Sequence, residues 1–96
     1  MKPPFVWTDL AKSDIGNNLR YVNEKWGAQT SFNFLRRLME SLEVVSRNPT
    51  TFQIINKKLS IRRFIVNNRI TLYYQVRKHD ILLITFFGTT AKTLKN

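Results

Sequence analysis

The first half of the chain carries apolar residues at helical spacing, in two consecutive runs. The first run is Ile15, Leu19, Val22 and Trp26, and the second is Leu35, Leu38, Met39, Leu42 and Val45. Spacing of this kind places each run on one face of a helix. Thr8 suits the N-cap of the first helix, Gly27 suits its C-terminal end, and RNP at 47–49 ends the second helix. The pattern predicts a helical hairpin over about residues 8–47.

The rest of the chain has the short apolar or alternating runs that are typical of strands. FVW at 5–7 predicts a strand over about residues 4–8, and a three-stranded meander is predicted over about residues 58–87. The meander strands are expected at Leu59–Val66, Arg69–Val76 and Ile81–Phe87. NN at 67–68 favours a type I′ turn, RKHD at 77–80 makes the second link, and residues 50–58 are expected to be irregular.

This order of elements, β-α-α-β-β-β, predicts a single α+β domain over residues 1–96, ending in a polar tail at 88–96. The helical hairpin is expected to pack on one face of a mainly antiparallel sheet. The chain has no cysteine, its start lacks the apolar run of a signal peptide, and no apolar stretch is long enough to span a membrane. We therefore expect a cytoplasmic protein that has no membrane partner.

The two adjacent arginines Arg62 and Arg63 must point to opposite faces of the predicted sheet. A turn at NN would set Arg63 opposite Leu72, and cross-strand partners share a face. The helices should then cover the face that carries Ile61, Arg63, Ile65, Ile70, Leu72 and Tyr74. Arg63 would be the one charge there, explained by a sheet edge where its stem covers the core, with a functional role as the alternative. Arg62 would open onto the other face, beside Tyr73.

That other face would continue into the last strand as an apolar strip. The strip would consist of Phe64, Tyr73, Leu82, Ile84 and Phe86, rimmed by Arg62, Arg69 and Arg77. An exposed strip of this kind marks a partner site. The alternative is that the first strand or the tail covers it.

Charge changes this picture, because it is high and unevenly spread. Sixteen basic and six acidic residues give a net charge of +10. Residues 1–46 carry six Lys/Arg and five Asp/Glu, net +1, whereas residues 47–96 carry ten Lys/Arg and one acid, net +9. Such a field favours an anionic partner, either nucleic acid, an acidic protein or an anionic membrane surface. A basic surface that has no ligand is the alternative.

Candidate chemistry is limited by the shortage of acid and base groups. Cations that could contact a target are Lys57, Lys58, Arg62, Arg69, Arg77 and Lys78. His79, the only histidine, lies in a charged link, where a solvated role is the more typical one. Arg62 is the best catalytic candidate and Tyr73 the next, although the catalytic residues stay unknown. One histidine and no cysteine form no recognisable ligand set, so we expect no metal and no cofactor.

In three segments the sequence resembles the RelE/ParE superfamily, the toxins of bacterial type II toxin–antitoxin modules. The segments are FVWTDLAKSDIGNNLRYVNEKWG, the RNP that closes the second helix, and IRRFIVNNRITLYYQV followed by ILLITFF. The resemblance covers nearly the whole chain in order. It implies a small basic toxin, associated with plasmid stabilisation and growth inhibition, that is silenced by an acidic antitoxin in a hetero-oligomer. The strip residues Phe64, Tyr73, Ile84 and Phe86 are the candidate antitoxin contacts.

The resemblance also implies two possible activities. RelE-like toxins cut mRNA in the ribosome, and there the position that falls on Arg62 stabilises charge at the phosphate. ParE-like toxins poison DNA gyrase. The nucleases place a Tyr or His near the chain end, and other relatives carry an Asp and an Arg where this chain has Gly88 and Thr90. A ParE-like or degenerate toxin is therefore favoured over a competent endoribonuclease, which is the alternative, with a basic nucleic-acid-binding module as a further one.

Overall fold

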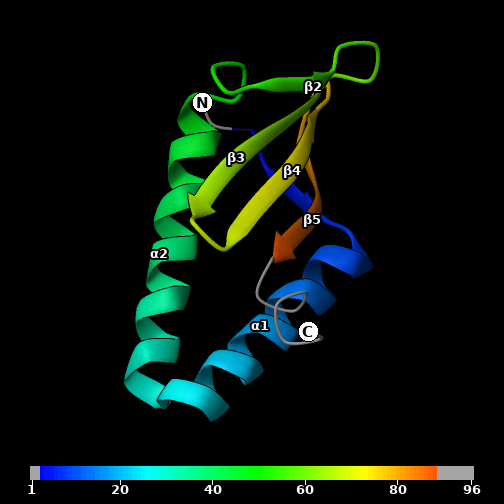
Figure 1. Ribbon diagram of the computed structural model, residues 1–96. Coiled ribbons are helices and arrows are strands. Elements are labelled where there is room, and N and C mark those ends of the chain that lie inside the picture. Colours follow the sequence, from blue (N-terminus) through cyan, green and yellow to red (C-terminus); the bar gives the residue numbers. More distant parts are fainter. Residues whose placement is uncertain (1–2, 89–96) are drawn as a thin grey trace.

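The computed structural model describes residues 3–88, which form two helices on one side of a five-stranded sheet. The elements are β1 (Phe5–Trp7), α1 (Asp9–Trp26), α2 (Ala28–Arg47), β2 (Ile54–Asn56), β3 (Ile61–Asn67), β4 (Ile70–Val76) and β5 (Ile81–Gly88). The strand order is β1-β5-β4-β3-β2, and only β1 and β5 run parallel. Figure 1 shows the two helices as a V-shaped hairpin beside the sheet. The predicted α+β fold is confirmed.

The helical hairpin begins and turns at the residues that the sequence indicates. The Thr8 hydroxyl accepts a hydrogen bond from the Ala11 N–H at 2.9 Å and lies 2.8 Å from the Ile84 carbonyl oxygen, to which it can donate. It therefore caps α1 and attaches its start to β5. Gly27 ends α1 with φ 92°, a conformation that glycine adopts without the penalty of a Cβ. None of the described helices combines the length and apolar character needed to cross a membrane.

The core lies between the hairpin and one face of the sheet. Its buried apolar residues are Ala11, Ile15, Leu38, Leu42, Val45, Val66, Ile70, Leu72, Tyr74, Ile81, Leu83 and Phe86. The alternation predicted for β4 is confirmed, because Ile70, Leu72 and Tyr74 are all buried. The opposite face of the sheet carries no helix in the described part of the chain.

One strand was not predicted. Residues 50–58 were expected to be irregular, but Ile54–Asn56 form β2 at the edge of the sheet beside β3. The strand is three residues long and exposed throughout, with Ile54 43% and Ile55 46% accessible. A strand of three exposed residues makes few contacts. It forms by pairing with β3, and the sequence of residues 50–58 alone does not indicate this pairing.

The register of β3 was wrong by one residue. The link between the paired residues Asn67 and Ile70 is Asn68 and Arg69, rather than the two asparagines. The Asn67 side-chain oxygen accepts hydrogen bonds from the backbone N–H groups of Arg69 and Ile70, at 2.7 and 2.9 Å, and so stabilises this later turn. Moving a two-residue link by one residue would move the pairing by two positions and leave the faces unchanged. An irregularity between Ile65 and Asn67, where Val66 has no cross-strand partner, takes back one of these positions, so that the register of β3 differs by one residue from the prediction and its faces are exchanged.

Arg62 therefore lies on the face covered by the helices, and Arg63 lies on the open face. Arg62 is opposite Tyr74, Arg63 is opposite Tyr73, and Phe64 is opposite Leu72. The predicted placement of Arg62 on the open face beside Tyr73, with Arg63 against the core, is thus wrong. Phe64 likewise faces the core side.

Phe86 is a second correction, in β5. An irregularity in the β4–β5 pairing between Tyr73 and Tyr74 shifts the strand, so that Phe86 lies opposite Leu72. Its side chain is 1% exposed, and its ring is 5.6 Å from that of Trp7. The predicted exposed strip through Phe86 does not exist.

Candidate functional site

The first candidate residue, Arg62, is held under the segment that joins α2 to β2. Its Nη1 donates a hydrogen bond to the Phe52 carbonyl oxygen at 2.7 Å. Its Nε is buried and has no hydrogen-bond partner in the described structure. The Phe52 ring contacts the Phe64 ring edge-on, with centroids 4.7 Å apart, next to this guanidinium. Arg62 therefore attaches the segment after α2 to the sheet, an arrangement that gives it a structural role.

Tyr74 holds the same segment at Pro49, which is nearer to the end of α2 than Phe52 is. The fully buried Tyr74 hydroxyl donates to the Pro49 carbonyl oxygen at 2.8 Å. Burial disfavours the phenolate and raises the pKa of Tyr74 to about 12, partly opposed by the positive charge of Arg62. The cross-strand pair Arg62 and Tyr74 thus supplies two donors for the carbonyl groups that follow α2.

These contacts predict different stability effects for the two adjacent arginines. Arg62→Ala is expected to lower the free energy of unfolding by about 1–3 kcal/mol, because the Phe52 carbonyl loses a charged donor. Arg63→Ala, on the open face, is expected to change it by less than about 0.5 kcal/mol. Urea denaturation of the two variants measures both values. Equal losses, or a larger loss for Arg63→Ala, would contradict the faces assigned to β3.

The open face carries an exposed mixture of apolar and basic side chains. Ile65, Thr71 and Phe87 are successive cross-strand partners, and Ile65 is 60% and Phe87 42% exposed. Arg63 lies opposite Tyr73, and its Nε donates to the Gln53 side-chain oxygen at 2.8 Å.

The structure separates the four predicted antitoxin contacts into two pairs. Tyr73 and Ile84 are half-buried and lie outside the core, whereas Phe64 packs against the core and Phe86 is part of it. Only the first pair can therefore contribute to a surface without unfolding.

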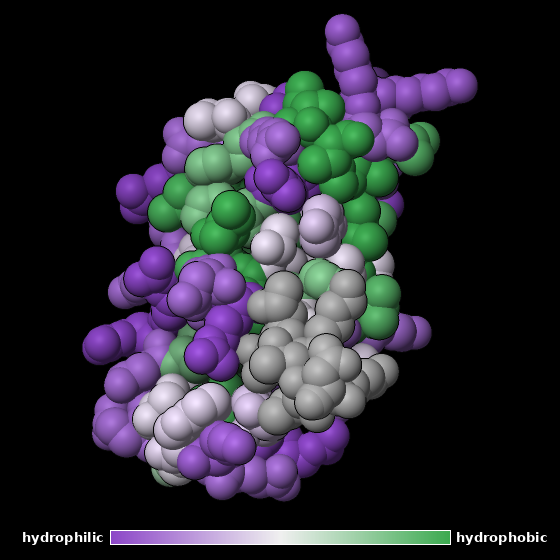
Figure 2. Space-filling view, viewed as in Figure 1, coloured by the Kyte–Doolittle hydropathy of each residue, from purple (hydrophilic) through white to green (hydrophobic). Residues whose placement is uncertain are grey.

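Most of the predicted cationic contacts gather at one end of the sheet. Lys57 and Lys58 lie in the β2–β3 link and Arg77 and Lys78 in the β4–β5 link, and a backbone hydrogen bond from Val76 to Ser60 joins these links. Figure 2 shows long hydrophilic side chains projecting beyond the apolar surface at this end, near β2. The structure thus brings four of the six predicted cations together.

Among residues 3–88, Arg77 is the only one of these four that forms an ion pair. It binds both carboxylate oxygens of Asp80, at 2.6 and 3.0 Å. This hydrogen-bonded pairing raises the pKa of Arg77 and lowers the pKa of Asp80. Arg62 lies near this end of the sheet, but its guanidinium is bound to the Phe52 carbonyl. Arg69 lies at the opposite end of the sheet, in the β3–β4 turn. Among residues 3–88, no three His, Cys, Asp or Glu side chains form a group that could hold a metal ion.

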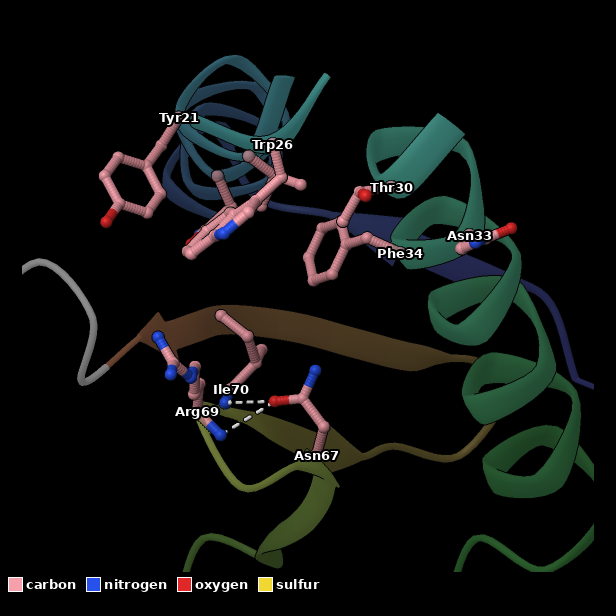
Figure 3. Close-up of a pocket in the computed structure, with 10 residues that line it drawn as sticks. Tyr21, Trp26, Thr30, Asn33, Phe34, Asn67, Arg69 and Ile70 are labelled. Carbon is pink, nitrogen blue, oxygen red and sulfur yellow. Dashed lines mark hydrogen bonds between the residues drawn. The ribbon is translucent and has the colours of Figure 1, made fainter. Parts of the chain in front are cut away.

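A cavity of about 420 Å³ opens at that opposite end, between the hairpin and the β3–β4 turn. Figure 3 shows Trp26 and Phe34 reaching down from the helices toward Arg69 and Ile70 on the sheet side. Trp26 was assigned to the buried stripe of α1, but it is 50% exposed. The hairpin extends past the end of the described strands, so no strand of residues 3–88 lies beneath the last turn of α1 (Figure 1). The sequence pattern therefore gives no sign of this cavity.

The fold is similar to that of solved toxin structures of the ParE and YoeB type. No family model and no curated protein matches the sequence. The chain is similar to the Pseudomonas aeruginosa structure described as a chromosomal ParDE toxin–antitoxin system, with a TM-score of 0.77 and 10% identity, over 91% of this chain and 96% of that one. The YoeB dimer of Staphylococcus aureus gives a TM-score of 0.62 and 12% identity, over 91% and 97% of the chains.

A structure of the Escherichia coli DinJ–YafQ complex gives a TM-score of 0.59 and 11% identity, over 95% and 97% of the chains. Identities this low establish the fold alone. The resemblance seen in the sequence is confirmed at that level.

Proposed function

We propose that this chain is the toxin of a type II toxin–antitoxin module, of the ParE-like branch or a degenerate relative of it. The observation that carries the proposal is the fold, which matches such proteins over nearly the full length of both chains. The TM-score of 0.77 to the ParDE structure is higher than the 0.62 and 0.59 for YoeB and YafQ. DNA gyrase is the target that the ParE-like branch implies.

The surroundings of Arg62 support a toxin that binds its target without breaking a bond. A group that stabilises charge on a phosphate must direct its donors at the ligand. Arg62 instead donates to a backbone carbonyl and buries its Nε. His79, the only histidine of the chain, lies in the exposed β4–β5 link, remote in the fold from the cavity.

The proposed partner is an acidic antitoxin. The half of the chain with a net charge of +9 includes β2–β5 and would attract such a protein. We place the contact on the open face, where Tyr73, Ile84, Ile65 and Phe87 provide apolar surface beside Arg63. Phe64 and Phe86 no longer belong to the proposed contact. An association of the two chains would form the expected hetero-oligomer.

The cross-strand pair Arg63 and Tyr73 supports a second candidate function, ribosome-dependent cleavage of mRNA. These side chains are opposite each other on the open face. Arg63 could bind the scissile phosphate, and the Tyr73 hydroxyl could serve in proton transfer. In that case cleavage would depend on Arg63 rather than on Arg62.

Induced synthesis of the chain in a bacterial host is expected to halt growth and to change plasmid supercoiling while transcripts stay whole. Where a short acidic open reading frame lies next to the gene, its synthesis in the same cells should restore growth. Leu72→Asp is the control, because a carboxylate in the core prevents folding and should abolish the effect. Cut transcripts that become whole with Arg63→Ala would favour the nuclease. Normal growth with folded protein present would refute an active toxin of either kind and leave only the degenerate relative.

A further inference from the structure

The cavity at the tip of the hairpin has the size and the walls of a small-molecule site. Its volume of about 420 Å³ falls within the roughly 300–1,000 Å³ usual for such sites. Trp26 and Phe34 form its helical wall and Ile70 lies on the opposite wall (Figure 3). The Tyr21 ring meets the Trp26 ring edge-on, at 5.7 Å and 83°, and so supports the indole at the entrance. An exposed indole supported in this way is a stacking platform for a planar ring.

Two side-chain amides give the cavity a fixed hydrogen-bond acceptor and a fixed donor. The Asn18 amide nitrogen donates to the Asp14 carbonyl oxygen at 2.7 Å, which leaves the Asn18 oxygen as an acceptor. The Asn67 oxygen is occupied by the N–H groups of the β3–β4 turn, which leaves its NH₂ group as a donor. Figure 3 shows that nitrogen directed toward the helices, across the cavity. Nucleobase edges present both a donor and an acceptor to such groups.

Charge adds an anion-binding element at the rim. Arg69 lines the cavity beside Ile70 and is exposed. A guanidinium binds phosphate through paired N–H donors. Arg69 lies in the half of the chain with a net charge of +9, so the surrounding field also attracts an anion.

We propose that this cavity binds a nucleotide, with the base between Trp26 and Ile70, its edge toward Asn18 and Asn67, and its phosphate at Arg69. A purely apolar side chain from a protein partner fits less well. It would cover the Asn18 oxygen and the Asn67 NH₂ group and leave both without a hydrogen bond. The proposal goes beyond the toxin function and does not depend on it, because no step of the argument uses the fold comparison.

Titration of the full chain with AMP, followed by NMR, tests the proposal. We expect the Trp26 indole N–H and the Asn67 side-chain NH₂ resonances to shift and to saturate, with a dissociation constant of about 1 mM or tighter. Adenosine, which lacks the phosphate, should shift the same resonances at higher concentration. A single-stranded tetranucleotide of adenylate distinguishes a free nucleotide from a base within a strand, because tighter binding of the tetranucleotide would identify the strand as the source.

Asn67→Asp is the sharpest variant, because a carboxylate can still accept the two N–H groups of the turn but removes the NH₂ donor. It should weaken AMP binding at least about tenfold. Trp26→Ala removes the stacking surface and should also weaken it. Arg69→Gln should weaken AMP more than adenosine, whereas Arg20→Gln, an exposed arginine of α1 outside the cavity, controls for the loss of one charge.

Three kinds of outcome would overturn the proposal. The first is that neither AMP nor the tetranucleotide shifts the two resonances of the folded protein. The second is that inorganic phosphate alone reproduces the shifts, or that Asn67→Asp and Trp26→Ala, shown to be folded by their spectra, bind AMP unchanged. The third is that an acidic leucine-containing peptide shifts the resonances and no nucleotide does, which would make the cavity a protein-docking site. Growth arrest in the toxin experiment bears on none of them.

Discussion

Replacement of Asp14 by alanine is expected to lower the free energy of unfolding by about 2–3 kcal/mol. Asp14 lies in α1, and its carboxylate accepts two hydrogen bonds from β5. The Thr85 hydroxyl donates at 2.5 Å and the Phe86 backbone N–H donates at 3.0 Å, both to the same oxygen. The site is partly buried, so loss of the carboxylate leaves two donors poorly hydrated where α1 packs on the sheet.

Urea denaturation of Asp14→Ala beside Asp9→Ala measures the effect against a matched control. Asp9 is also an acid of α1, but it is exposed in the first turn, where it interacts with the helix dipole. Its replacement should cost no more than about 1 kcal/mol. Asp14→Asn keeps an acceptor oxygen but removes the charge, so its loss in the free energy of unfolding should lie between those of Asp14→Ala and Asp9→Ala. A loss for Asp14→Ala no larger than that for Asp9→Ala would show that the α1–β5 contact contributes little.

The helical hairpin could be predicted because its signals are local. The apolar spacing, the Thr8 cap and the turn at Gly27 act within a few residues of the positions that they determine. The faces of β4 followed from alternation in the same way. Pairing between strands is different, because a single extra residue within a strand determines which face every side chain beyond it occupies.

The faces of β3 were wrong for that reason. Both asparagines of NN are good turn residues, and the pattern gave no basis for placing Asn67 before the turn rather than in it. In the structure the Asn67 side chain accepts two backbone N–H groups, and the link consists of Asn68 and Arg69. The irregularity between Ile65 and Asn67 then shifts the rest of β3 by one residue and exchanges its faces. The adjacent pair Arg62 and Arg63 hid the error, because either register places one arginine on each face. Their roles are therefore exchanged relative to the sequence-based hypothesis.

The candidate site could be predicted in part. Clustering of the basic links at one end of the sheet follows from a meander and needs no exact register. The cavity could not be predicted, because it arises where the hairpin extends past the strands, and helix length relative to strand length sets that overhang. Trp26 has the spacing of a core residue, but no strand among the described residues lies beneath it, and it is 50% exposed.

Tyr74→Phe is expected to lower the free energy of unfolding by about 1–3 kcal/mol at neutral pH, because the Pro49 carbonyl loses its donor. The ring itself stays in the core, so this loss measures the contribution of the hydroxyl alone to the free energy of unfolding. Tyr73→Phe, the neighbouring tyrosine outside the core, is the control and should change the value by less than about 0.5 kcal/mol. Equal effects would contradict the contact between Tyr74 and the segment after α2.

The stability difference between the wild type and Tyr74→Phe should depend on pH, and the raised pKa of Tyr74 determines the sign of this dependence. Burial raises that pKa from 10.0 to about 12, so the unfolded chain loses the phenolic proton at a lower pH than the folded protein does. Below pH 10 both states keep the proton, and the contribution of Tyr74 to stability is constant.

Between pH 10 and 12 the unfolded state is selectively stabilised by ionisation, so the contribution falls as the pH rises. The advantage of the wild type over Tyr74→Phe should therefore be constant up to about pH 10 and shrink toward pH 12. Denaturant unfolding of both proteins across this range measures it. An advantage that stays constant to pH 12 would mean that the phenol is not held neutral by burial beneath the segment that Arg62 also attaches.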